Sequence, residues 1–123
     1  MRFSLDTDIN KYSIKSYGPG WVNVNERELR RSLILAPEQL ITDWPPQCLA
    51  ELDETHIATI AALEPEIVLL GTGEQQRFPH PRLTRELLTR GVGVEIMNTA
   101  AACRTYNILM LEGRRVVAAL LIG

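Results

Sequence analysis

The chain contains few of the residues that mark several common classes of protein. Among its 123 residues are two cysteines, Cys48 and Cys103, and two histidines, His56 and His80. The two cysteines lie far apart and make no disulfide framework, and no cysteine–histidine group has zinc spacing. We therefore expect no metal site and a reducing, cytoplasmic setting.

Long apolar runs are also missing. No segment approaches the ~20 apolar residues that a membrane-spanning helix needs, and the longest, VVAALLIG at residues 116–123, has the length of a strand. The opening residues, MRFSLDTDINKY, lack the apolar stretch of a secretory signal. Membrane insertion and export are therefore not expected.

Lysine is scarce and the charges are unevenly distributed. No lysine or arginine lies between Arg31 and Arg77, where eight acidic residues fall, whereas the segment from Arg77 to Arg115 has seven arginines and three glutamates. Two interpretations stay open: solvated faces of separate elements, or a surface with an acidic and an arginine-rich side that suits a protein partner or anionic ligand. A net charge of −2 and 6% aromatics argue against nucleic acid as a partner.

The first part of the chain has the alternation of β-strands. YSIKSYG, WVNVN and LRRSLILAP predict an antiparallel β ribbon within residues 1–37, with one face turned inward. The following PEQLITDWPPQ is expected to be a connection, because Pro45 and Pro46 oppose regular structure. Trp44 is interpreted as an anchor to the core or, alternatively, as an exposed contact for a partner.

Helix and strand alternate from residue 53 to 123. Helices are expected over DETHIATIAALEP, over PRLTRELLTRG with Leu83, Leu87 and Leu88 inward, and from Asn98 or Thr99 onward. EIVLLG, VGVEIM and VVAALLIG are expected to be buried strands. This α-β-α-β-α-β core and the ribbon predict one domain, 1–123, of the α/β class: three layers, with a mixed, largely parallel central sheet, flanking helices and an N-terminal antiparallel β ribbon.

A cleft is expected where two strands end. If the strands EIVLL and VGVEIM lie side by side, the GTG segment after EIVLL lies near the start of the helix after VGVEIM. The amino end of a helix favours the binding of an anion or carboxylate. The cleft residues would be Gly71, Thr72, Gly73, Arg77, Asn98, Thr99 and Arg104. GTG matches neither the dinucleotide fingerprint nor a P-loop, so these glycines can equally serve only a tight turn.

No catalytic residue and no cofactor are indicated. Cys103 follows three alanines, has no histidine near it in sequence, and is interpreted as a small core residue. His80, between two prolines, is expected to be plain loop. Tyr106 and Asn107 are interpreted as a structural bracket that ties the helix to nearby backbone; a ligand contact is the alternative for Asn107.

IVLLGTG, GVGVEIMNTAAACRTYNIL and EGRRVVAALL carry a resemblance to a known family. They are similar to the Mth938-like family, domain of unknown function 498, which includes mitochondrial complex I assembly factor three. The resemblance implies a mixed sheet with flanking helices and an extra β layer. It also implies a role through protein contacts rather than catalysis, although most family members have no known reaction.

Two hypotheses follow, and a third, a thiol enzyme acting through Cys103, ranks below both. The chain is a non-enzymatic interaction or assembly-factor-like domain with a protein partner, using the arginine-rich segment from Arg77 to Arg90. Alternatively it binds a small molecule or anion, or is an enzyme, at the Gly71–Arg77 loop and the Asn98 helix start. The oligomeric state stays open.

Overall fold

Two sheets of unequal size organise the protein, whose computed structural model describes residues 11–122. The smaller sheet is antiparallel and consists of β1 (Ile14–Gly18), β2 (Trp21–Val24) and β3 (Arg27–Leu29). Asn25 and Glu26 connect β2 to β3 with φ angles of 46° and 78°. Positive φ at both central residues is what a two-residue hairpin turn of type I′ requires, so the strands leave it with their natural twist.

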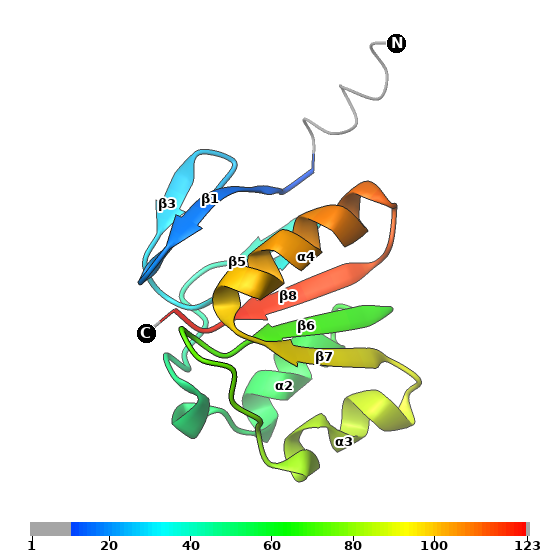
Figure 1. Ribbon diagram of the computed structural model, residues 1–123. Helices are drawn as coiled ribbons and strands as arrows, with labels where there is room; N and C mark the ends of the chain where they lie inside the picture. Colours follow the sequence, from blue (N-terminus) through cyan, green and yellow to red (C-terminus); the bar gives the residue numbers. More distant parts are fainter. Residues whose placement is uncertain (1–10, 123) are drawn as a thin grey trace.

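The larger sheet is mixed. Its five strands lie in the order β5 (Gln39–Ile41), β4 (Leu33–Ala36), β8 (Val116–Leu120), β6 (Ile67–Gly71) and β7 (Gly93–Met97) (Figure 1). The last three are mutually parallel, whereas β4 runs antiparallel to β8 and β5 antiparallel to β4. Every residue of β8 is buried, as expected for the central strand of a sheet covered on both faces.

Helices cover both faces of this sheet. On one face α2 (Glu54–Ala61) and α3 (Pro81–Thr89) pack over an apolar cluster that includes Trp44. On the other face α4 (Thr99–Leu111) and the smaller sheet enclose a second cluster. A short 3-10 helix, η1 (Leu49–Glu51), precedes α2. The predicted three-layer α/β class with a mixed sheet is confirmed.

The crossovers explain which helix covers which face. The chain passes from β6 through α3 to its neighbour β7, then returns through α4 past β6 to β8. These two moves run in opposite directions across the sheet, so right-handed connections require helices on opposite faces. The exits of β6 and β7 therefore lead to opposite sides, which is where open α/β sheets form a crevice.

The boundary of the predicted ribbon is wrong. Residues 1–10 lie outside the described part, and β1 to β3 end at Leu29; β4, expected in the ribbon, belongs to the larger sheet. Leu33, Ile34 and Leu35 are all fully buried, because β4 presents apolar side chains to both faces. The segment expected to be an irregular connection also contains β5, which extends the sheet by one short strand.

Two side chains near the helices, Leu88 and His80, differ from expectation, whereas Trp44 has the burial expected of an anchor to the core. Leu88 is 56% exposed, so the apolar stripe of α3 consists of Leu83 and Leu87 alone. Trp44 is buried, and the alternative of an exposed contact is wrong. His80 is more than loop, because its side chain caps α3 by accepting a hydrogen bond from the amide of Arg82 (3.1 Å).

Candidate functional site

The ends of β6 and β7 lie side by side, with Gly71 in register with Met97. This brings together five of the seven residues expected to form a cleft, namely Gly71, Thr72, Gly73, Asn98 and Thr99. Arg77 is close, since its amide donates to the hydroxyl of Thr72 (3.1 Å). The guanidinium of Arg104 donates to the hydroxyl of Tyr17 (3.0 Å) on the smaller sheet, and Tyr17 lines a groove together with Gly73, Asn98 and Thr99.

The crevice between the two strand ends is filled by the protein's own backbone. The amide of Thr99 donates to the carbonyl of Gly73 (2.8 Å), and the amide of Gly73 donates to the Thr99 hydroxyl (2.8 Å). That hydroxyl donates in turn to the carbonyl of Leu121 (2.8 Å). The amide of Thr72 donates to the carbonyl of Met97 (2.9 Å). The polar groups expected to meet a ligand are thus largely satisfied internally.

Gly71 has a structural role in this arrangement. A Cβ atom at this position would lie 3.0 Å from the Cα of Thr99 and 3.1 Å from a methyl group of Leu120. The start of α4 therefore approaches β6 more closely than a side chain would permit. Gly73 adopts a φ of +98°, which favours glycine whether or not a ligand binds.

The amino end of α4 is also mostly occupied. Its cap, Asn98, accepts a hydrogen bond from the amide of Ala101 on its side-chain oxygen (2.8 Å) and from that of Ala102 on its carbonyl (3.0 Å). With the Thr99 amide bonded to Gly73, only the Ala100 amide of the first turn lacks a partner within residues 11–122. One free amide makes a weak anion site.

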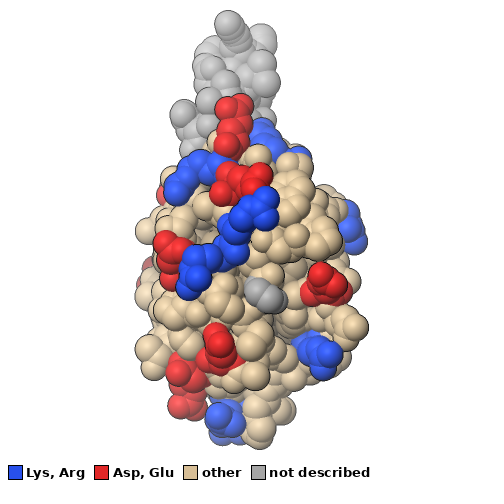
Figure 2. All heavy atoms as spheres, turned by 90° about the vertical axis from the view of Figure 1, so that its left-hand side faces the viewer, with Lys and Arg blue, Asp and Glu red and all other residues tan. Residues whose placement is uncertain are grey.

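Open space lies beside the closed crevice. A groove of about 320 Å³ runs between the β1–β2 turn at Pro19 and the start of α4, with Gly73, Asn98 and Ala100 among its lining residues. A second, shallower depression of about 850 Å³ continues past Arg77 and η1. Figure 2 views this side of the molecule, where acidic and basic side chains intermingle in the upper part and lie scattered over the surface below.

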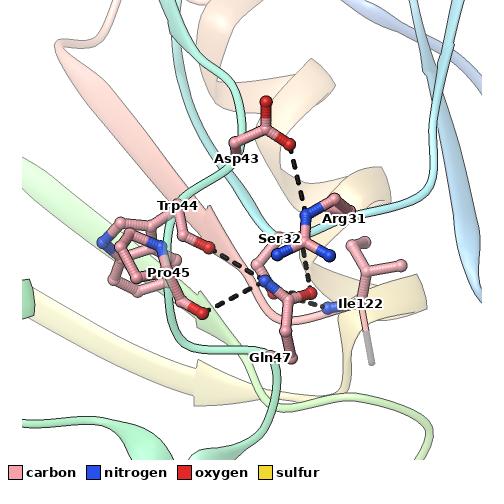
Figure 3. A network of polar contacts seen from close by, with 7 residues as sticks. All are labelled: Arg31, Ser32, Asp43, Trp44, Pro45, Gln47 and Ile122. Atoms are coloured by element: carbon pink, nitrogen blue, oxygen red, sulfur yellow. Dashed lines mark hydrogen bonds and ion pairs between the residues drawn. The ribbon is translucent and has the colours of Figure 1, made fainter.

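A glutamine network fixes the wall beside this depression (Figure 3). The side-chain oxygen of Gln47 accepts from the amide of Ser32 (3.1 Å), and its nitrogen donates to the carbonyls of Trp44 (3.0 Å) and Pro45 (3.2 Å). The buried Ser32 hydroxyl accepts from the amide of Ile122 (3.1 Å). The sequence does not predict this network, because neither Gln47 nor Ser32 belongs to a motif and the residues that they bind are distant in sequence.

The cysteine of α4 has the properties of a core residue. Cys103 is fully buried, and burial raises the pKa of its thiol to about 12, an effect that the charge of Arg104 only partly opposes. A nucleophilic thiolate requires the opposite shift. Burial also raises the pKa of the neighbouring Tyr106 phenol. Cys48 is exposed, and both cysteines are free.

Tyr106 and Asn107 connect α4 to the start of β1. The side chain of Asn107 accepts from the amide of Ile14 (2.9 Å) and donates to its carbonyl (2.7 Å), so it pairs with one residue of backbone as a strand would. The hydroxyl of the buried Tyr106 donates to the carbonyl of Tyr12 (2.8 Å). These are the contacts of a bracket; its contribution to stability stays a prediction.

The charges that are separated in the sequence partly mix in the structure. Arg114 pairs with Glu66 (2.9 Å) and Arg31 with Asp43 (3.3 Å). Hydrogen bonds from the Arg115 amide and the Arg114 side chain lower the pKa of Glu66. By contrast, Arg82 and Arg85 of α3 are exposed and form no ion pair within the described residues.

The described residues thus form a three-layer α/β domain with a closed crevice, and among residues 11–122 no cluster of potential metal ligands is found. This chain belongs to the family described as protein of unknown function (DUF498/DUF598), whose model matches residues 14–121. The membership expected from sequence is confirmed. In the part of the chain that the structure describes, no helix has the length and apolarity to span a bilayer.

Two curated relatives and one solved structure illustrate the membership. The "13 kDa major membrane protein" of Francisella tularensis is 33% identical over 104 residues, which cover 83% of this chain and 84% of that protein. "NADH dehydrogenase [ubiquinone] 1 alpha subcomplex assembly factor 3" of Danio rerio is 31% identical over 110 residues, covering 88% of this chain but 63% of that protein. A Bordetella pertussis protein described as a Mth938-like domain is 37% identical with a TM-score of 0.81, covering 94% of this chain and 87% of that one.

Proposed function

We propose that this chain is a non-enzymatic protein-interaction domain that acts in the manner of an assembly factor. The observation that carries the proposal is the closure of the crevice, because it removes the usual place for chemistry in an open α/β sheet. The similarity to an assembly factor adds support, although the chain spans only 63% of that relative.

The proposed partner surface is the loop from Arg77 and helix α3 up to Arg90. Its arginines are exposed, and Arg82 lacks an acidic partner within residues 11–122. Phe78 in the same loop is 71% exposed. Exposed arginine beside an exposed aromatic side chain is the combination that protein interfaces favour, and it suits a partner with an acidic surface.

Affinity purification with mass spectrometry tests this proposal. The wild-type chain is expected to recover a protein that the double variant Arg77→Glu, Arg82→Glu fails to retain. The double variant Lys15→Glu, Arg27→Glu is the matched control, because both residues are exposed on the smaller sheet and the charge change is equal. Equal recovery by both double variants would contradict the proposed surface.

A second candidate function is the binding of a small molecule or anion in the groove beside Asn98. The groove volume of about 320 Å³ lies at the lower end of that of ligand pockets. A metabolite screen by thermal shift tests it, with Ala100→Leu as the variant, since a larger side chain there would fill the groove. If no ligand raises the melting temperature of the wild type and fails to raise that of Ala100→Leu, this candidate function has no support.

A cytoplasmic location is proposed on the basis of the two free cysteines. Because the Francisella relative is named as a membrane protein, fractionation of cells is the informative test. Recovery of the chain with the membrane pellet after a high-salt wash would contradict this proposal.

A further inference from the structure

Within residues 11–122, the outer edge of β7 pairs with no strand (Figure 1). In a parallel ladder, successive residues direct their backbone polar groups to opposite edges. The amide of Gly93 donates to Glu66 (3.1 Å), and the carbonyl of Met97 accepts from Thr72 (2.9 Å). Gly93, Glu95 and Met97 therefore face β6, whereas Val94 and Ile96 face the open edge.

Some polar groups on this edge already have partners. The amide of Val92 donates to the carbonyl of Leu87 (3.0 Å), and the side chain of Gln76 donates to the carbonyl of Ile96 (2.9 Å). Four groups then lack a partner within residues 11–122: the amide and carbonyl of Val94, the amide of Ile96 and the carbonyl of Val92.

These four groups are complementary to a second copy of themselves. We propose that β7 pairs antiparallel with β7 of a second copy of this chain, around a two-fold axis at Val94. In that register the two Val94 residues exchange both of their hydrogen bonds, and each Ile96 amide donates to the Val92 carbonyl of the other copy. The Val92 amide of one copy would also face the Ile96 carbonyl of the other, and both groups already have hydrogen-bond partners within their own chain.

The side chains of the edge fit the same register. Val92, Val94 and Ile96 are half-buried and pack against the cluster under α2 and α3, so the pairing would continue that apolar layer across the two-fold axis. On the other face, Glu95 would lie opposite Gly93 of the second copy rather than opposite another carboxylate. The strand pair itself therefore sets no charge against a like charge.

Helix α3 adds a second contact to the strand pair. It packs against β7 beside α2, so a two-fold axis at the outer edge of β7 would bring the two α3 helices next to each other on the same face of the joined sheets. A right-handed crossover turns the flank of α3 that carries Thr84 and Leu88 toward the open edge. The pairing would thus bury the side chain of Leu88, which is 56% exposed in the single chain.

Phe78 is the apolar residue that Leu88 would approach in the second copy. Leu88 lies near the start of β7, whereas Phe78 follows Gln76, which is bonded to the end of that strand at Ile96. Antiparallel pairing sets the start of one strand against the end of the other. Two exposed apolar side chains would then bury each other in an isologous interface.

The oligomeric state of the full chain across a dilution series, by sedimentation velocity, is the first test. The wild type is expected to form a dimer, and Leu88→Glu is expected to weaken it by about tenfold or more. The matched control is Leu111→Glu, which changes a leucine of similar exposure (65%) on α4, distant from this edge. Circular dichroism verifies that both variants remain folded.

Cysteine cross-linking in a Cys48→Ser background tests the register. Residues in a hydrogen-bonded antiparallel pair have Cα atoms about 5.5 Å apart, within disulfide range, so Val94→Cys should form a covalent dimer on mild oxidation. Glu95→Cys, one residue later and on the other face, should not. The proposal would be overturned if the chain sediments as a monomer at every concentration, if Leu111→Glu weakens the dimer as much as Leu88→Glu, or if Glu95→Cys cross-links as well as Val94→Cys. A chain that pairs its β7 edge with a different protein would give the first of these results.

Discussion

Helices α3 and α4 follow neighbouring parallel strands and both begin at a side-chain cap, yet their surroundings differ. Helix α4 buries four residues, among them Tyr106, and is tied to the smaller sheet through Tyr106 and Asn107. Helix α3 buries only Leu83 and Leu87, and the rest of its surface carries charged side chains and the exposed Leu88. The comparison indicates that α4 is the more firmly anchored of the two helices, while both expose apolar side chains, Leu88 on α3 and Ile108 and Leu111 on α4.

The largest difference between the helices is expected on truncation of Tyr106. Tyr106→Ala removes a fully buried aromatic ring and should lower the free energy of unfolding by about 3–5 kcal/mol. Arg85→Ala on α3 should change it by less than about 0.5 kcal/mol, because that side chain is exposed. Urea denaturation measures both, and similar losses in the two variants would contradict the comparison.

Removal of the bracket at Asn107 is expected to have the next largest effect. Asn107→Ala leaves the amide and carbonyl of the buried Ile14 without their hydrogen bonds, which should cost about 2–3 kcal/mol. Arg104→Ala is the control, since it removes only an exposed hydrogen bond to Tyr17 from the same helix. Unchanged stability of Asn107→Ala in a melting experiment would reject the bracket.

The helix caps should differ by a smaller amount. Asn98→Ala removes the cap of α4 at its contact with β6 and should cost about 1–2 kcal/mol, whereas His80→Ala at α3 should cost about 0.5 kcal/mol. The reason is that the start of α4 is held against the sheet, while α3 begins at an exposed residue. A larger loss from His80→Ala than from Asn98→Ala in thermal melts would reverse the comparison.

The sequence predicted the core of this fold because its elements have distinct periods and end at caps or glycines. Buried runs such as IVLLG and VVAAL are unambiguous, and right-handed crossovers then order their strands. The assignment of β4 failed for a different reason. Its pairing of Leu33 with Leu120 joins distant parts of the chain, and local alternation contains no information about which sheet a strand enters.

The candidate site was predictable only in part. Crossover geometry placed Gly73 near Asn98, because parallel strands end at the same edge of a sheet. The closure of that crevice depends on the rotamer of the Thr99 hydroxyl and on the path of Leu121 after β8, which no local pattern encodes. The contact of Arg104 with Tyr17 was not predictable for the same reason, since it follows from the position of the smaller sheet.

The smallest expected effect concerns the thiol of α4. With a pKa of about 12 and full burial, on the order of one Cys103 thiol in ten thousand is ionised at pH 8, so iodoacetamide should label Cys48 and leave Cys103 unmodified until urea unfolds the chain.

The raised pKa of the Cys103 thiol also sets the sign of the pH dependence of stability. Below the ordinary value of 9.0 for a cysteine thiol this group costs no stability, and from there toward pH 12 the unfolded state ionises first, so Cys103→Ala should flatten the alkaline loss of stability. Labelling of Cys103 in the folded protein as fast as that of Cys48 would show that α4 opens as readily as an exposed loop, and its contrast with α3 would be lost.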